Sequence, residues 1–330
     1  MRADKCIVIA ESEGMSPAAI GILRQLGGVR LGNLDRCQLM REVQDADVLW
    51  VRLRHRIDHQ LLSQSSRLKV IVSPTTGLNH IDLAAAAERG IHVLSLRGEV
   101  DFLRQIRATA ELTIGLMLAL LRHIPQAVQH VETGGWSRDL FQGRELYGKT
   151  VGIVGLGRLG TIVAGYLAAF GARILATDPR PLQPLPDCVK LVDARELLRQ
   201  SDIVSLHVDL CDATQGFWGK EQFEQMKRGA WFVNTSRGEL IDERALLWAL
   251  QGGHLAGAAL DVLAGEDAAG MAMHPLVVYA GERDNLIITP HLGGCTAESQ
   301  AKTEDFMASK LRDFCLASRD ESSASSKGSL

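Results

Sequence analysis

The sequence lacks an apolar run long enough to cross a membrane. The longest, Leu112–Leu121, contains Thr113 and lies between Glu111 and Arg122, whereas a membrane-spanning helix needs about 20 apolar residues. The basic segment, apolar stretch and cleavage site of a signal peptide are also missing, because the first residues lead directly into the strand-like Cys6–Ala10. These absences argue against a membrane-spanning or secreted protein and predict a cytoplasmic one, in which Leu112–Leu121 is a buried helix.

Cysteines are few and scattered. The six stand at positions 6, 37, 188, 211, 295 and 315, with no Cys-x-x-Cys pair and no tight cluster of cysteine and histidine. Zinc sites and disulfide frameworks need such groupings, so we expect no metal site and reduced thiols, as in a cytoplasm.

An excess of basic residues is missing too. Lys and Arg number 36 against 39 Asp and Glu, which gives a formal net charge of −3. Nucleic-acid binders and polybasic membrane anchors carry a positive footprint. The expected partner is therefore a small molecule, with no nucleic acid and no membrane.

What the sequence does contain is a regular alternation of short apolar runs and amphipathic stretches. Its 330 residues, 46% of them hydrophobic, are enough for two domains. The alternation predicts the α/β fold class, with two doubly wound, Rossmann-like domains that have parallel sheets and a cleft between them. Strands are expected at Cys6–Ala10, Val29–Leu31, Val48–Val51, Val70–Ser73, His92–Leu94, Val151–Val154, Arg173–Ala176, Ile203–His207, Trp231–Asn234, Ala258–Asp261 and Leu286–Ile288.

Two further segments have distinct compositions. One long helix is predicted from Phe102 to about Val131, and its middle is apolar nearly all round. Such a helix needs more than one burying surface, which another domain or a second subunit would supply. The tail from Ala317 to Leu330 is rich in Ser and poor in apolar residues, so we expect it to be disordered.

A Gly-x-Gly-x-x-Gly turn follows the strand expected at Val151–Val154. Gly155 permits a tight turn, Gly157 lets the backbone approach a pyrophosphate, and Gly160 lets the next helix pack closely on the strand. Asp178 ends the following strand, where a carboxylate accepts hydrogen bonds from an adenosine ribose and repels a 2′-phosphate. This pattern favours NAD over NADP. The alternatives are a structural glycine turn, or Arg180 binding a 2′-phosphate.

Three residues with suitable chemistry follow later strands. Arg237, Glu266 and His291 each stand in or near a loop at the strand ends to which the glycine turn also belongs. Reduction of a 2-oxo acid needs a fixed cation for the carboxylate and carbonyl, a proton donor, and an anion that orients the donor. Arginine, histidine and glutamate fit these roles in that order. Any one of the three alone is more often structural, so the prediction depends on their joint occurrence behind the glycine turn.

In these stretches the sequence resembles the D-isomer-specific 2-hydroxyacid dehydrogenase family. Besides the glycine turn with Asp178, the matching stretches are Ser73–Asp82, Arg107–Glu111, Asn234–Gly238, Asp261–Glu266 and Pro290–Gly294. The resemblance implies a phosphoglycerate dehydrogenase-like oxidoreductase that uses NAD as cofactor. It also implies a substrate domain from residues 1–103 plus 296–330, an NAD-binding domain from residues 104–295, and a homodimer joined through the latter.

The family's pattern also implies roles for individual residues. Arg237, Glu266 and His291 take the catalytic roles given above, with His291 as proton donor. Cofactor contacts are expected at Gly155, Gly157, Arg158, Leu159, Gly160, Asp178, His207, Val208, Thr235, Ser236, Asp261 and Gly293. Substrate contacts are expected from Arg52, Thr76, Gly77 and Arg97.

Two stretches depart from the family's pattern. Many relatives have an Asn-x-Pro-like turn where this chain has Ser95–Ile106, and Gly265–Arg283 has Glu266-Asp267 where Glu-Pro is common. Both are expected to border the substrate pocket. Four arginines at 52, 54, 56 and 97 can therefore be interpreted in two ways: as a site for a second anionic group of the substrate, or as solvated surface residues.

Two other functions stay open on the sequence alone. One is a dinucleotide-sensing interaction protein, like the transcriptional corepressors that share this family's fold, although no partner-binding extension is evident. The other is a dehydrogenase of formate or phosphite on the same scaffold, although formate has no carbonyl to polarise.

Overall fold

The computed structural model describes residues 5–266 and 270–327. The chain divides into two compact units, one formed by Met1–Leu103 together with Thr296–Leu330 and the other by Arg104–Cys295. We call these unit 1 and unit 2. Their assignment as substrate and cofactor domains stays a prediction at this point.

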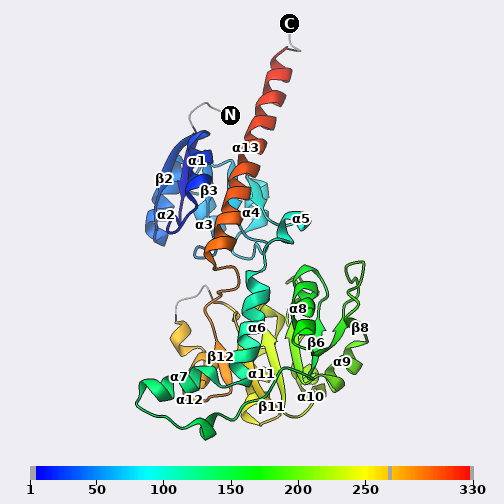
Figure 1. The fold of residues 1–330 in the computed structure, drawn as a ribbon. Helices are drawn as coiled ribbons and strands as arrows, with labels where there is room; N and C mark the ends of the chain where they lie inside the picture. The colour runs from blue at the N-terminus through cyan, green and yellow to red at the C-terminus, as the bar shows by residue number, and fades with distance from the viewer. Residues whose placement is uncertain (1–4, 267–269, 328–330) are drawn as a thin grey trace. The chain divides into compact units, whose positions relative to one another are not determined.

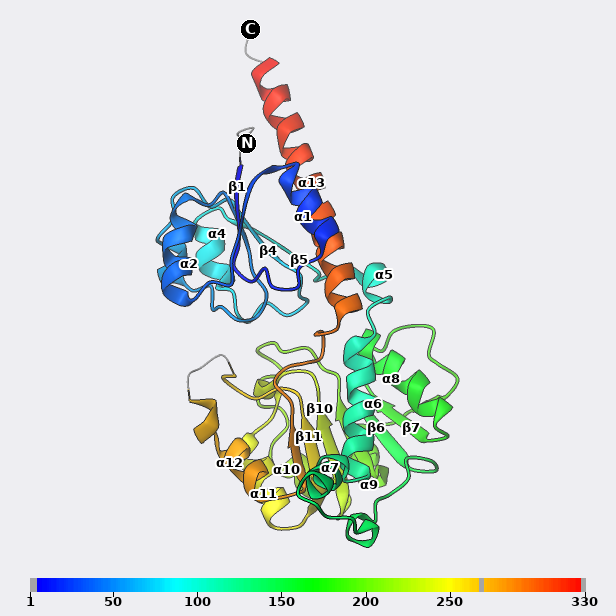
Figure 2. The same cartoon turned by 60° about the vertical axis from the view of Figure 1, so that its left-hand side comes forward.

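Unit 1 is built on a parallel five-stranded sheet in the order β2-β1-β3-β4-β5. The strands are β1 (Lys5–Ile9), β2 (Gly27–Leu31), β3 (Val48–Trp50), β4 (Val70–Ser73) and β5 (His92–Ser95). The helices are α1 (Pro17–Arg24), α2 (Arg36–Glu42), α3 (His59–Leu62), α4 (Leu83–Glu88), α5 (Val100–Leu103) and α13 (Ala297–Lys327). Helices α2, α3 and α4 pack on one face of the sheet, while α1 and α13 lie side by side on the other (Figures 1 and 2).

Unit 2 is built on a parallel seven-stranded sheet in the order β12-β11-β10-β9-β6-β7-β8. The strands are β6 (Thr150–Val154), β7 (Arg173–Thr177), β8 (Val189–Leu191), β9 (Ile203–Leu206), β10 (Ala230–Asn234), β11 (Leu255–Leu260) and β12 (Leu286–Ile288). The helices are α6 (Ala108–Leu121), α7 (Ile124–Glu132), α8 (Arg158–Ala169), α9 (Ala194–Gln200), α10 (Lys220–Gln225), α11 (Glu243–Gln251) and α12 (Pro275–Glu282). Helices α9 to α12 bury one face and α6 and α8 the other, and the two parallel sheets confirm the predicted fold class.

Aspartate begins several of these helices. At each of these starts the Asp side chain accepts a backbone N–H from the first turn, which is worth about 1 kcal/mol per helix. The residues are Asp35, Asp58, Asp82, Asp193 and Asp242. These caps fix where the helices start, and the loops between strand ends and helix starts can then carry functional side chains.

The prediction of a single long helix from Phe102 to Val131 is wrong. The structure has α5, α6 and α7 in its place, and His123 between α6 and α7 takes a left-handed φ of 52°. Pro125 in the first turn of α7 lacks the N–H that a continuous helix would need. The apolar helix α6 packs on α7, α8, β10, β11 and β12 of its own unit, so it needs no second subunit to bury it.

Other departures from the sequence-based expectation are local. Strand β8 was not predicted, because its three residues are half-buried or exposed and form no apolar run. The tail was expected to be disordered from Ala317, but α13 continues to Lys327, and no Gly or Pro interrupts it before Gly328. Residues 328–330 lie outside the described part. Within the described residues no helix is both long and apolar enough to cross a membrane.

Candidate active site

The glycine turn lies where the strand order of unit 2 reverses. The chain runs from β6 outward to β7 and β8, then returns to β9 on the other side of β6. In open α/β sheets, ligands bind at the carboxyl ends of the strands at such a point. Gly155 follows β6 with a φ of 91°, and a Cβ added there would collide with the carbonyl oxygen of His207, which follows β9. Only glycine therefore lets the two strand ends approach this closely.

The other two glycines of the turn differ in the space that a side chain would have. A Cβ on Gly160 would collide with the carbonyl oxygen of Gly155, so this glycine is needed for α8 to pack on β6. A Cβ on Gly157 would meet no protein atom within 4 Å. Gly157 is the N-cap of α8 and offers no capping side chain to the N–H groups of the first turn. This cradle fits the pyrophosphate of a dinucleotide, since an unblocked helix N-terminus binds anions.

Asp178 is held beside the same turn. Its Oδ2 accepts the N–H of Leu156 at 2.7 Å and its Oδ1 accepts the N–H of Arg180 at 2.7 Å. The carboxylate is half-buried, whereas Arg180 is exposed. The carboxylate is thus fixed at the end of β7 with lone pairs left for further donors.

Arg158 and Leu159 begin α8. The Arg158 guanidinium donates from Nη1 to the carbonyl oxygen of Ile106 at 2.9 Å. Burial lowers the pKa of Arg158, and the nearby charge of Asp209 opposes that effect. Leu159 packs, partly buried, against the core between α6, α8 and the sheet.

His207 and Val208 follow β9 on the other side of the turn. His207 Nε2 lies 2.9 Å from Ser205 Oγ, while Nδ1 is buried and has no hydrogen-bond partner in the described part of the chain. Burial lowers the pKa of His207 to about 4, so its ring is neutral at pH 7. The side chain of Val208 is one of the nearest neighbours of Gly155.

The loop after β10 carries Arg237. Fully buried Asn234 holds this loop, because its Oδ1 accepts the N–H of Ser236 at 3.0 Å and its Nδ2 donates to the carbonyl oxygen of Arg237 at 2.9 Å. Thr235 Oγ1 lies 2.9 Å from Thr113 Oγ1, and Ser236 Oγ donates to Leu206 O at 2.8 Å. The predicted cofactor-lining side chains Thr235 and Ser236 thus also tie the loop to α6 and β9. The Arg237 side chain is only half-buried.

Glu266 and His291 form a hydrogen-bonded pair between the loops after β11 and β12. His291 Nδ1 bonds to Glu266 Oε1, and Glu266 Oε2 accepts the N–H of Leu263 at 3.2 Å. No hydrogen bond joins His291 Nε2 to any described residue, and the His291 side chain is 24% exposed. His291 has a φ of 54°, a left-handed conformation that a residue with a Cβ adopts only at a cost.

Asp261 holds the loop that carries His291. Its Oδ1 accepts Thr289 Oγ1 at 2.6 Å and the N–H of Leu292 at 2.8 Å, and its Oδ2 accepts the N–H of Gly293 at 2.8 Å. Burial raises the pKa of Asp261, and these hydrogen bonds oppose that rise. Asp261, which follows β11, and Gly293, in the loop after β12, are both predicted to line the cofactor; both are buried and in contact.

The residues expected to contact the substrate follow three strands of unit 1. Arg52 follows β3, Thr76 and Gly77 follow β4, and Arg97 follows β5. The N–H groups of Thr76 and Gly77 donate to no acceptor among the described residues, which suits a carboxylate site. Arg52 and Arg97 follow strands that β4 separates, and Arg97 is exposed, whereas Arg52 forms an ion pair with Glu304 of α13.

Comparisons with known proteins identify the family of the chain. The sequence profile of the D-isomer specific 2-hydroxyacid dehydrogenase NAD binding domain matches residues 114–293. D-3-phosphoglycerate dehydrogenase of Methanocaldococcus jannaschii is 38% identical over 310 residues, which cover 93% of this chain and 57% of that protein. Hydroxypyruvate reductase of Thermotoga maritima is 36% identical over 280 residues, covering 84% of this chain and 88% of that protein. The chain belongs to the D-isomer specific 2-hydroxyacid dehydrogenase family.

The family's solved structures share this fold. The crystal structure of D-lactate dehydrogenase from Aquifex aeolicus, complexed with NAD and lactic acid, matches with a TM-score of 0.82 at 27% identity and covers 96% of each chain. As a member of the family, the chain contains its NAD-binding domain within unit 2. It spans only about half the length of the D-3-phosphoglycerate dehydrogenases that it matches.

One contact near the Glu266–His291 pair was not expected from the sequence. A Cβ on Gly238 would collide with the backbone of Leu263 and Ala264, so the Arg237 loop touches the Glu266 loop. Glu243 Oε1 accepts the N–H of Ala264 at 2.8 Å, and its Oε2 lies 3.1 Å from His274 Nε2. Burial raises the pKa of Glu243. The only sequence signal was its place after the helix cap Asp242. Asp267, which stands where Pro is common in the family, lies outside the described residues.

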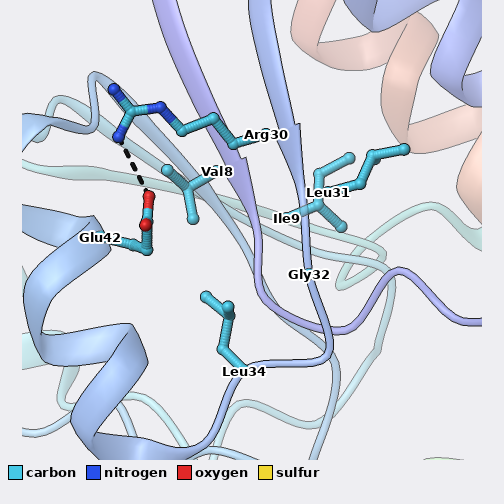
Figure 3. A pocket seen from close by; sticks show the side chains of 7 residues that line it. All are labelled: Val8, Ile9, Arg30, Leu31, Gly32, Leu34 and Glu42. Atoms are coloured by element: carbon cyan, nitrogen blue, oxygen red, sulfur yellow. Dashed lines mark hydrogen bonds and ion pairs between the residues drawn. The ribbon is translucent and has the colours of Figure 1, made fainter.

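A small pocket in unit 1 lies apart from all the candidate residues (Figure 3). It lies between β1, β2 and α2 and measures about 100 Å³, whereas small-molecule sites are roughly 300–1,000 Å³. Arg30 and Glu42 form an ion pair at 3.0 Å beside it. The pocket is too small for a dinucleotide.

Proposed function

We propose that the chain is an NAD-dependent oxidoreductase that transfers a hydride between the nicotinamide and a small (D)-2-hydroxy or 2-oxo acid. The observation that carries this proposal is the Glu266–His291 pair, in which His291 Nε2 has no hydrogen-bond partner among the described residues. It lies beside the Arg237 loop, at the strand ends that also carry the glycine turn. Membership of the family supports the same activity.

Each of the three side chains has a distinct role in this proposal. Arg237 binds the substrate carboxylate and polarises the carbonyl, because its planar cation matches both oxygens. His291 gives a proton from Nε2 to the carbonyl oxygen on reduction and takes it back on oxidation. Glu266 accepts the Nδ1 proton of His291, which fixes the ring and favours imidazolium. When bound, the nicotinamide supplies or accepts the hydride.

Unit 1 contributes the remaining substrate contacts in this proposal. The N–H groups of Thr76 and Gly77 hold the substrate carboxylate. Arg52 and Arg97 contact the rest of the substrate. Unit 1 is then the substrate domain and unit 2 the cofactor domain.

The cofactor is NAD rather than NADP in this proposal. Asp178 is fixed beside the turn and would repel a 2′-phosphate. The Arg180 side chain is exposed and forms no hydrogen bond with any described residue. The comparison of kcat/KM with NADH and NADPH tests this assignment. A preference for NADPH would reverse it and give Arg180 the phosphate.

The chain forms a homodimer through unit 2 in this proposal. No residue of α7 is buried, and its apolar residues Ile124, Val128 and Val131 are exposed. Two apolar residues soon after the helix, Trp136 and Leu140, are exposed as well, and Trp136 is 90% exposed. Such an apolar surface is typical of a protein interface. Sedimentation should give a dimer, and Val128→Lys should shift it towards monomer; a wild-type monomer would contradict the assignment.

The function is tested by purified protein, NADH and a panel of 2-oxo acids, with the absorbance of the reduced cofactor as readout. The expected result is turnover with at least one short-chain 2-oxo acid and a product of D configuration. Binding of NADH without turnover of any acid in the panel would contradict the proposal and favour a dinucleotide-sensing role.

A further inference from the structure

Two adjacent backbone N–H groups in the loop after β11 are bound by two different carboxylates. The N–H of Leu263 donates to Glu266 Oε2 at 3.2 Å. The next N–H, that of Ala264, donates to Glu243 Oε1 at 2.8 Å. Gly265 follows with a left-handed φ of 69° and has no side chain that could fix the turn. Glu243, at the start of α11, thus anchors the backbone two residues before Glu266.

Glu243 also holds the start of α12. Its Oε2 lies 3.1 Å from His274 Nε2, and the side chains of Glu243 and His274 are only 17% and 16% exposed. His274 is the N-cap of α12, and its Nδ1 accepts the N–H of Leu276 at 3.3 Å. Because Nδ1 accepts this bond, the ring proton lies on Nε2 and is donated to Glu243. Each oxygen of Glu243 therefore accepts a hydrogen bond, which a carboxylate allows and a carboxamide does not.

The backbone that Glu243 anchors also meets the loop that carries Arg237. A Cβ added to Gly238 would lie 2.0 Å from the carbonyl carbon of Leu263 and 2.1 Å from the nitrogen of Ala264. The two loops are thus packed together without space for a side chain. A shift of this peptide bond would therefore change the spacing between the two loops.

We propose that Glu243 is a positioning residue for the proton transfer, because it fixes the loop from which Glu266 orients His291. This inference rests on the proposed function, since it concerns the same proton donor. A displacement of about 1 Å at a catalytic group can lower a rate by about a hundredfold. Loss of the anchor should therefore lower kcat. Binding of NADH should not change, because the glycine turn follows β6, and β9 and β10 separate β6 from β11.

The first test is Glu243→Gln, which keeps the size of the side chain and replaces one acceptor oxygen with a donor group. In steady-state assays with a 2-oxo acid it should lower kcat by about tenfold or more and leave the KM for NADH unchanged. Glu221→Gln is the matched control and should keep the wild-type kcat, because Glu221 is an exposed glutamate in the first turn of α10. A folded Glu243→Gln protein with the wild-type kcat overturns the inference.

A second variant separates the anchor from the cap of α12. His274→Asn keeps a residue type preferred at an N-cap, but its shorter side chain does not reach Glu243. It should lower kcat by about threefold alone and have no further effect in Glu243→Gln, because both changes break the same link. Effects that multiply overturn the inference. If Glu243→Gln does not fold, a wild-type kcat in His274→Asn overturns it instead.

Proton magnetic resonance gives a readout that needs no turnover. The proton between His291 Nδ1 and Glu266 should give a resonance far downfield, identified by its loss in His291→Gln. In Glu243→Gln this resonance should broaden through exchange with water. A residue that only stabilises the fold would leave it sharp, and that result overturns the inference. A wild-type protein that shows the resonance but reduces no 2-oxo acid contradicts the proposed function instead.

Discussion

The strand ends of the two sheets are stabilised in different ways. In unit 2, the loops after β10, β11 and β12 are held by Asn234 and Asp261, which bond to backbone N–H groups. His291 Nε2 has no hydrogen-bond partner there within residues 5–266 and 270–327. In unit 1, buried Glu304 and Arg52 bond to each other. Backbone-directed bonds thus hold the loops of unit 2 without using His291 Nε2, whereas in unit 1 the charge of Arg52 is used by a partner from the far end of the chain.

The largest effect is expected at the glycine turn of unit 2. Gly155→Ala forces a side chain into a left-handed conformation and against the His207 carbonyl, so it should lower the free energy of unfolding by more than about 3 kcal/mol. Gly157→Ala is the matched variant: its Cβ meets no protein atom, so it should fold normally and lose about tenfold or more in NADH affinity. Urea denaturation and fluorescence titration measure the two effects. Equal stability losses in both variants would contradict the distinction drawn between the two glycines.

The next effect concerns the proton donor of unit 2. His291→Gln should lower kcat by about a hundredfold or more, within the range for loss of a general acid. NADH affinity should change little. The exposed histidine variant His59→Gln is the control and should match the wild type in steady-state assays. A His291→Gln protein with a wild-type rate would mean that another group supplies the proton.

Acid should weaken unit 2 through His207. Burial lowers its folded-state pKa to about 4 from 6.5, so the unfolded chain takes up a proton first as the pH falls. Stability is therefore complete above about pH 6.5 and declines towards pH 4, by roughly 2–3 kcal/mol for this group. Urea denaturation of His207→Gln across this range should show a shallower decline than the wild type. Parallel curves for the two proteins would rule out His207 as the source.

The smallest effect is expected at Glu11 in unit 1, where a rise in pH rather than a fall should lower the free energy of unfolding. Burial raises its pKa, so its contribution is present below the unfolded-state value and is lost as the pH rises through the folded-state value. The stability of Glu11→Gln relative to the wild type should therefore increase as the pH rises from about 4.5, the unfolded-state value. The exposed Glu13→Gln is the matched control and should follow the wild type. If the stability of Glu11→Gln relative to the wild type decreases with rising pH, the assigned direction of the Glu11 pKa shift is wrong.

Most of the sheet architecture could be predicted because buried parallel strands appear as short apolar runs. Ile203–Leu206 is fully buried and was expected within one residue, whereas β8 has no buried residue. The break at His123 was missed although Pro125 marks it, because apolar residues at helical spacing lie on both sides. The glycine turn and the positions of Arg237, Glu266 and His291 could be found, since each follows a recognisable strand.

Contacts between distant segments could not be predicted in this way. Arg52 and Glu304 are 252 positions apart, and neither has a local pattern that points to the other. Arg52 was expected to contact the substrate because of the family resemblance, and its pairing with Glu304 cannot be seen from its own neighbourhood. The same holds for Glu243, whose two partners lie in the loop after β11 and at the start of α12.

The packing of α13 on α1 has a consequence for synthesis on the ribosome. Ser16 and Glu304, which join these helices, are 288 positions apart, so at about 5–20 residues per second the second arrives roughly 15–60 seconds after the first. During that interval one face of the first sheet has no covering helix from the far end of the chain, while unit 2 is completed. We therefore expect unit 2 to finish folding first and chaperone binding to nascent chains to be concentrated on the uncovered strands β4 and β5, which α13 contacts.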